Sequence, residues 1–153
     1  STSYYARSRR DLIRLVMEQL SAESQADLTD IEVLGKLTVR QATDLVGRLA
    51  ERLILNGDAQ AARFALMFEV RDDDELRREL TVDAPVRRSF DEKAVELLRA
   101  LGVADPEEKA PEFVALVDAV LMYRAVDAAP IDPAGVVETY LDGLVRRKPT
   151  AAL

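Results

Sequence analysis

The stretch Phe113-Val-Ala-Leu-Val-Asp-Ala-Val-Leu-Met-Tyr123 contains a single charged residue, Asp118, in eleven positions. A helix with this pattern presents apolar side chains on more than one face, so a single neighbour cannot cover it. Asp105-Pro106-Glu107-Glu108, just before it, is a helix-start signal, because proline suits the first turn and acids satisfy its free amides. The stretch therefore predicts a long helix that several other helices surround.

Helix signals dominate the rest of the chain as well, and strand signals are nearly absent. Apolar residues recur at steps of three and four, in segments that begin at capping residues and end at glycine or proline. This pattern predicts one all-α domain of six or seven helices. The expected helices cover residues 8 to between 24 and 28, 38–56, 58–70, a segment after 72–75 that Pro85 kinks or breaks, 86–101, 106–123 and 133–148, with a loop over 27–37.

Several of these boundaries have a specific physical basis. Ser8 with Asp11, and Thr38 with Gln41, fit the arrangement in which two side chains cap the free amides of a first helical turn. Gly57 is expected to end its helix in a left-handed conformation. The four acids at 72–75 could suggest a cation site, but acids at a helix start satisfy the same free amides, so we interpret them as a cap.

The centre of the expected helix 58–70, Phe64-Ala-Leu-Met-Phe68, is apolar on every side. This pattern is typical of a helix that is buried all round. We therefore expect this helix to be the central one of the body.

The composition weighs against an enzyme. The 153 residues include neither histidine nor cysteine, so the commonest general base, thiolate chemistry, disulfides and the usual zinc ligands are absent. No nucleophile–base pair, metal-ligand cluster or phosphate-binding glycine loop stands out, and we predict no catalytic residue, metal or cofactor. No bilayer-spanning run or signal peptide is visible, which predicts a cytoplasmic protein without membrane contact. A small helical enzyme is the weakest alternative.

Charge is distributed unevenly along the chain. Residues 1–14 carry a net charge of +3, whereas the rest carries −10, giving −7 in total. A basic head with two tyrosines on an acidic body suggests two functions in one molecule, with any nucleic-acid contact confined to the head. From charge alone, a frayed terminus with solvated arginines is the alternative.

The last two expected helices carry more apolar surface than one body needs. Two helices from each of two copies can close a four-helix bundle, and an apolar patch of that size is rare on monomers. The alternative is that both are core helices of a monomer, but we favour the dimer. The predicted contacts are Leu116, Ala119, Val120, Tyr123, Val137, Tyr140, Leu141 and Leu144.

The head, Ser1-Thr-Ser-Tyr-Tyr-Ala-Arg-Ser-Arg-Arg-Asp-Leu12, resembles a segment of the tetracycline-repressor (TetR) family of transcription regulators. There, the recognition helix ends in a pattern like S/T-x-S/Y-Y-H/Y-F, followed by Ser, Lys or Arg, and Leu. Ala6 stands where the family has phenylalanine. The fitting residues are Ser1, Ser3, Tyr4, Tyr5, Ser8, Arg9 and Leu12.

Two further segments resemble the same family in the same order. Ala62-Arg-Phe-Ala-Leu-Met-Phe-Glu-Val-Arg-Asp-Asp-Asp-Glu-Leu76 is similar to the central helix and acidic cap of its ligand-binding domain. Ala100-Leu-Gly-Val-Ala-Asp-Pro-Glu-Glu108 is similar to the turn before its first dimer helix. The resemblance implies a remnant of the helix-turn-helix over residues 1–7, a ligand-binding and dimerisation domain over 8–148, and a tail over 149–153. It also implies a truncated regulator that lacks most of its DNA-reading module.

The implied function is ligand-controlled repression by a homodimer that places two recognition helices in successive major grooves. Ser1, Tyr4, Tyr5 and Arg9 would contact operator DNA, mostly its phosphates, in the full-length protein only. Ala6 and the acidic body leave room for an alternative, a dimeric small-molecule-binding or adaptor protein that never binds DNA.

The same resemblance implies a ligand pocket among the first five helices. Aromatic and methionine side chains suit an adaptable cavity, and the scarcity of central polar residues points to a small apolar or aromatic effector. For each candidate, a plain core position is the alternative. The candidates are Met17, Leu49, Phe64, Met67, Phe68, Phe90, Val117 and Leu121.

Overall fold

The fold is known from a computed structural model, which describes the backbone of residues 2–147 and the side chains of residues 8–147. Within that range there are helices and no strands, which confirms the predicted all-α class. The helices are α1 (Thr2–Thr29), α2 (Val39–Leu55), α3 (Gly57–Glu69), α4 (Asp74–Leu80), α5 (Pro85–Ala100), α6 (Pro106–Ala125) and α7 (Pro133–Arg146).

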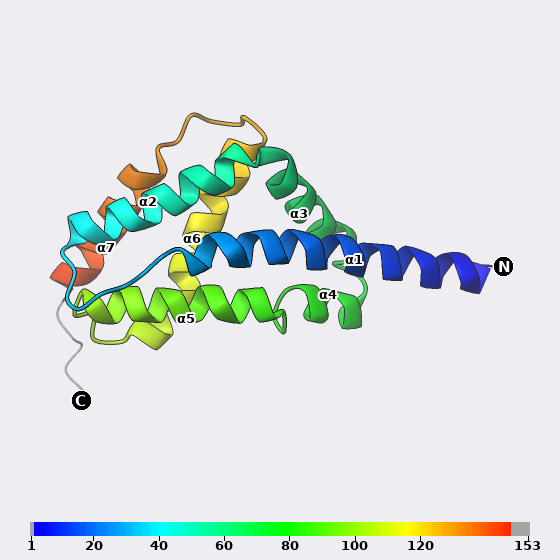
Figure 1. The fold of residues 1–153 in the computed structure, drawn as a ribbon, viewed down its shortest axis with the longest axis horizontal. Coiled ribbons are helices and arrows are strands. Elements are labelled where there is room, and N and C mark those ends of the chain that lie inside the picture. The colour runs from blue at the N-terminus through cyan, green and yellow to red at the C-terminus, as the bar shows by residue number, and fades with distance from the viewer. Residues whose placement is uncertain (1, 148–153) are drawn as a thin grey trace.

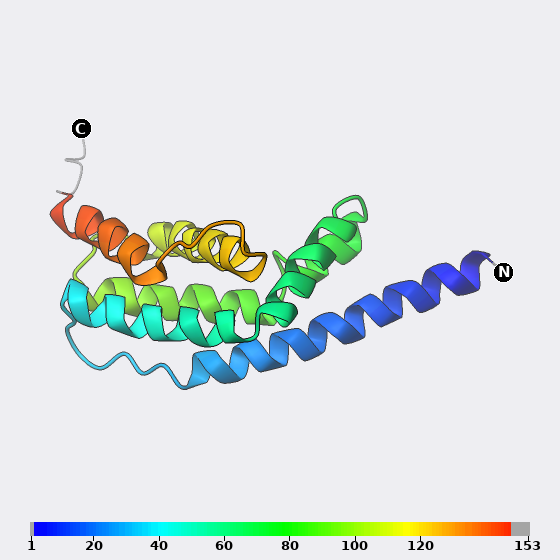
Figure 2. The ribbon, with the colours of Figure 1, turned by 90° about the horizontal axis from the view of Figure 1, so that it is seen from above.

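The helices stack in layers. In Figure 2, α1 forms one outer face, α2 and α5 lie in the middle, and α6 and α7 form the opposite face. Helix α6 contacts α2, α3, α5 and α7, as its nearly uncharged sequence predicted. The N-terminal part of α1 projects beyond the body (Figure 1).

Helix α1 is longer than predicted. It begins at Thr2 and runs unbroken to Thr29, so Ser8 lies inside the helix and the predicted start there is wrong. The physical reason is that the segment between Thr2 and Ser8 contains neither glycine nor proline to end a helical turn. One continuous helix therefore joins the segment before Ser8 to the body.

Helix α3 is not the central helix, which corrects the prediction from its apolar centre. The side chain of Phe68 is 64% exposed, and Gln60 is the one fully buried residue of the helix. Helix α3 lies at one end of the body, where α1, α2 and α6 contact it, and the side that carries Phe68 is exposed in the part of the chain that the structure describes (Figure 1).

The predicted cap of α2 is present in full. The backbone N–H of Gln41 donates to Thr38 Oγ1 at 3.2 Å, and the backbone N–H of Thr38 donates to Gln41 Oε1 at 2.9 Å. The acids after α3 are also confirmed as a cap, since Asp73 accepts a hydrogen bond from the backbone N–H of Leu76. The left-handed end expected at Gly57 is wrong: Gly57 begins α3, and Asn56 alone separates the two helices.

Thr38→Ala is expected to lower the free energy of unfolding by about 1 kcal/mol, because it removes the side chain that caps α2. Urea denaturation followed by circular dichroism measures the change. The matched control is Thr139→Ala on α7, whose hydroxyl bonds only to the Gly135 carbonyl of the same helix. Equal losses in the two variants would show that the cap contributes nothing specific.

The buried side chains form three adjacent clusters. The largest joins α2, α5, α6 and α7 around Leu98 and Leu141. A second surrounds Leu49 and Leu121. The third attaches α1 to the end of the body through Ile13 and Met17, which pack with residues 70 and 76. A movement of the turn between α3 and α4 would therefore change the packing of α1 against the body.

Candidate ligand cavity and dimer face

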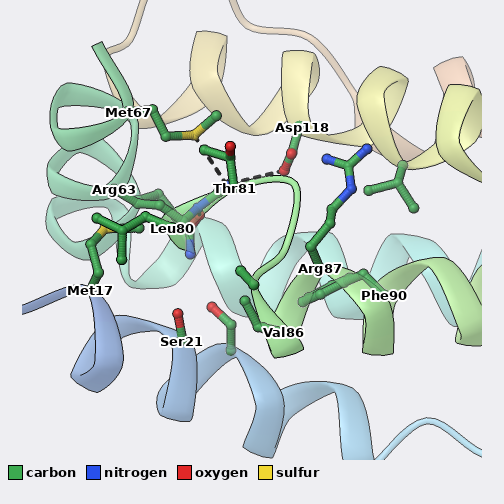
Figure 3. A pocket seen from close by; sticks show the side chains of 14 residues that line it. Met17, Ser21, Arg63, Met67, Leu80, Thr81, Val86, Arg87, Phe90 and Asp118 are labelled. Atoms are coloured by element: carbon green, nitrogen blue, oxygen red, sulfur yellow. Dashed lines mark hydrogen bonds and ion pairs between the residues drawn. The ribbon is translucent and has the colours of Figure 1, made fainter. Parts of the chain in front are cut away.

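A cavity of about 80 Å³ lies where α1, α3, the end of α4, α5 and α6 meet (Figure 3). Its wall mixes apolar side chains with arginine, glutamine, aspartate and hydroxyl groups. The lining residues are Met17, Ser21, Ser24, Gln60, Arg63, Met67, Leu80, Thr81, Ala84, Val86, Arg87, Phe90, Val114 and Asp118.

An ion pair between α3 and α6 forms one side of this cavity. The guanidinium of Arg63 donates to Asp118 Oδ1 at 2.9 Å and to Gln60 Oε1 at 3.1 Å. It also lies 4.2 Å from the centre of the Phe64 ring. Both charged side chains are largely buried, so the pair is held in a fixed geometry. The sequence marked Asp118 only as the lone charge of an apolar stretch, and nothing in it identified Arg63 as the partner.

Arg87 places a second guanidinium at the cavity. Its Nε lies 3.5 Å from Asp91 Oδ1, and Asp91 does not line the cavity. Among the described residues, Asp91 is the ion-pair partner of Arg87, through Nε, and neither terminal nitrogen of Arg87 makes a hydrogen bond to the protein. Figure 3 shows this side chain extending from α5 toward α6, on the same side as Asp118. The cavity wall therefore carries two guanidinium groups and one carboxylate, which sequence reasoning missed.

A second cavity, of about 60 Å³, adjoins the first and is lined almost entirely by apolar side chains. Phe90 and Val114 line both cavities, so they stand between them. The other lining residues are Leu28, Ile31, Leu45, Val46, Leu49, Lys93, Ala94, Leu97, Phe113 and Val117.

Five of the eight predicted ligand residues line these cavities: Met17 and Met67 the first, Leu49 and Val117 the second, and Phe90 both. The other three line neither. Phe68 points outward from α3, Leu121 is buried in the α2–α6 core, and Phe64 packs against that core under Arg63. The sequence predicted few central polar residues, whereas the first cavity is lined by several polar and charged side chains and the second almost entirely by apolar ones.

Helices α6 and α7 present their outer sides on the face opposite α1 (Figure 2). Of the predicted dimer residues, Ala119 and Tyr123 are exposed, whereas Leu116, Tyr140 and Leu144 are partly buried, the last two against the core cluster of α2, α5, α6 and α7. The other three are corrected. Val120, Val137 and Leu141 are 6%, 1% and 0% exposed within a single chain, so they have no surface to offer a partner. They lie on the inner sides of the same helices.

Tyr140 has a mixed environment on this face. Its ring stacks on Phe113 with centroids 5.6 Å apart, and its hydroxyl is buried without a hydrogen-bond partner among the described residues. Burial raises the pKa of Tyr140, and the nearby carboxylates of Glu112 and Asp105 raise it further. A buried hydroxyl of this kind usually finds a partner.

Three arginines of α1 pair with acids at the end of α3, at the cap of α4 and on α4. Arg9 pairs with Glu69, and Arg10 lies 3.4 Å from Asp73. Arg14 makes two hydrogen bonds to Glu79, at 2.8 and 3.0 Å. Arg9, a predicted DNA contact, thus has an exposed acidic partner in this structure. The predicted contacts Ser1, Tyr4 and Tyr5 have side chains outside the described residues.

The chain matches a known protein family. The model of the family described as "Tetracyclin repressor-like, C-terminal domain" matches residues 37–147, most of the chain. The chain belongs to the TetR-like family. The matched range contains α2 to α7, whereas α1 lies before it.

The TetR-like match agrees with the resemblance seen in the sequence at residues 62–76 and 100–108, both of which it contains. Searches of the curated proteins and of the solved structures gave no match. None of the described helices of this TetR-like chain is both long and apolar enough to cross a membrane.

Proposed function

We propose that this TetR-like chain is the sensing and dimerising part of a ligand-responsive, DNA-binding transcription regulator, a repressor that acts as a homodimer in the cytoplasm. The family match supports a regulator in general terms. The resemblance of residues 1–12 to the end of a recognition helix supports the DNA-binding role.

The observation that carries the proposal is the position of the first cavity. Met17, Ser21 and Ser24 of α1 form one side of it, and α3, α4, α5 and α6 form the others. Helix α1 continues without a break into the segment that resembles a recognition helix. A ligand between α1 and the body can therefore bias the orientation of that segment, and a coupling of about 1–3 kcal/mol is typical.

Dimerisation would use the outer sides of α6 and α7. Ala119 and Gly143 are small and exposed, so two copies of these helices can approach closely. A partner could also satisfy the hydroxyl of Tyr140. A two-fold dimer of this kind presents two DNA-binding segments one helical turn of DNA apart.

The test uses the complete product of the gene that encodes this chain and fluorescently labelled DNA from upstream of its own operon. We expect binding that weakens steeply with salt, because phosphate contacts release counterions. Absence of salt-dependent binding to every upstream fragment would reject the DNA-binding role.

Arg9→Ala in the same complete product should weaken binding to all DNA sequences and lower the magnitude of the salt slope by about one, because one phosphate contact is lost. The matched control is Arg99→Ala, which removes another exposed, ion-paired arginine at the far end of α5. A change in sequence preference alone would contradict a phosphate role for Arg9.

One observation favours a second candidate, a dimeric small-molecule-binding or adaptor protein without DNA binding. Arg9, Arg10 and Arg14 all pair with acids of the body, which lowers the positive charge that the basic head offers to DNA. Ligand binding and dimerisation without any salt-dependent DNA binding would support this candidate.

A further inference from the structure

We propose that the effector is a slender, amphipathic monocarboxylate, whose carboxylate binds Arg87 in the first cavity and whose apolar chain passes Phe90 into the second. This inference rests on the proposed function, since it names the ligand class of that regulator. It specifies where the carboxylate binds, why the ligand carries a single negative charge, and where the apolar chain of the ligand lies.

The anion site follows from the unused donors of Arg87. A guanidinium presents a planar fork of N–H groups that matches a carboxylate, with two parallel hydrogen bonds. Asp91 lies only at the Nε side, 3.5 Å away, and the terminal nitrogens point along the cavity wall toward α6 (Figure 3). A carboxylate in the cavity would complete the hydrogen bonding of this fork.

The limit of one charge follows from Asp118. This carboxylate already accepts a hydrogen bond from Arg63 at 2.9 Å, and the side-chain oxygen of Gln60 accepts a second one from the same guanidinium. Arg63 is therefore paired with a carboxylate of the cavity wall, whereas Arg87 pairs with Asp91 through Nε alone and keeps its terminal nitrogens for a ligand. A ligand with a second negative group would have to displace Asp118 or lie beside it, and like charges at close range destabilise one another.

The apolar channel follows from the two volumes. Cavities of about 80 and 60 Å³ are each small beside the ~300–1,000 Å³ of common ligand pockets, which favours a slender ligand over a bulky ring system. Phe90 lines both cavities, and a change of its rotamer would join them. A single alkyl chain is narrow enough to follow that path among the apolar residues of the second cavity.

The test is isothermal titration calorimetry of the 153-residue chain with three probes of equal length: octanoate, octan-1-ol and octylamine. We expect octanoate to bind at least tenfold more tightly than the alcohol or the amine, because a charge-assisted pair is lost in both. Equal binding of octanoate and octan-1-ol would overturn the carboxylate assignment. Failure of all three to bind at millimolar concentration would overturn the site.

Arg87→Met keeps the length of the aliphatic stem and should weaken octanoate binding at least tenfold, leaving octan-1-ol unchanged. The matched control is Arg88→Met, which removes the adjacent exposed arginine of α5 and should leave octanoate binding unchanged. Circular dichroism establishes that both variants are folded. If both variants bind octanoate like the unaltered chain, Arg87 does not hold the carboxylate.

A second variant tests the channel. Phe90→Ala should shift the preference from octanoate toward dodecanoate, because removal of the ring joins the two cavities. An unchanged ratio of the octanoate and dodecanoate affinities would show that the alkyl chain of the ligand does not pass Phe90 into the second cavity. Octanoate binding without any DNA binding by the complete gene product would support the carboxylate site and reject the proposed regulator function. DNA binding without octanoate binding would support the regulator function and reject the carboxylate site.

Discussion

Leu141→Ala is expected to lower the free energy of unfolding by about 2–5 kcal/mol, among the largest effects of any single substitution in this chain. Leu141 is fully buried on α7 and packs in the cluster that also contains Leu98, Val137 and Phe113. Removing its isobutyl group costs transfer free energy and leaves a cavity that rigid helix packing closes only in part.

Urea denaturation followed by circular dichroism measures this loss, at one protein concentration for all variants. The control is Val145→Ala on the same helix, whose side chain is 45% exposed and should change stability by about 0.5 kcal/mol or less. If Leu141→Ala gave a chain of unaltered stability that had merely lost its partner, Leu141 would belong to the dimer face and its place in the core would be wrong.

Ala119→Glu and Gly143→Glu are each expected to weaken self-association at least ~100-fold, because a symmetric dimer would bury two added charges without partners. Ala119 is exposed on α6, and a side chain built at Gly143 meets no atom within 4 Å in a single chain. The monomer should therefore tolerate both changes, and glutamate is the better helix former at position 143.

Sedimentation velocity at micromolar concentration measures the association. The unaltered chain should sediment as a species of twice 17.0 kDa, and both variants as monomers. Ala22→Glu, at an exposed position of α1 on the other face of the molecule, is the control and should remain dimeric. Dimers in all four proteins would place the interface away from α6 and α7.

Several helix boundaries were predictable from a local chemical signal. Thr38 with Gln41, Asp73, and Pro85 each act within one or two helical turns, and each works as the sequence indicated. The start at Ser8 was wrong because a capping residue permits a helix to begin and does not oblige the preceding segment to unfold.

The inner and outer sides of a helix were harder to assign. Periodicity reveals an apolar stripe, but it does not say whether a neighbour in the same chain or in a second copy covers it. Val137 and Leu141 therefore entered the predicted dimer face, although they lie in the buried cluster that α7 forms with α2, α5 and α6. Phe68 shows the opposite error: it was predicted to be buried but is exposed, because an apolar helix at the end of the body keeps one face in solvent.

The sequence predicted several apolar residues that line the cavities, but it did not predict the charged residues that line the first one. Met17, Met67 and Phe90 were found from residue type and approximate position. The pairing of Arg63 with Asp118 joins residues 55 positions apart in the sequence, and the free fork of Arg87 depends on its rotamer. Tertiary packing alone determines both.

Native mass spectrometry of the complete gene product, mixed with a DNA duplex from upstream of its own operon, shows whether the protein binds DNA as a homodimer. We expect a complex of two protein copies with one duplex, because dimerisation through α6 and α7 would pair two DNA-binding segments. Free protein beside free duplex at micromolar concentration, or a complex with a single protein copy, would contradict it.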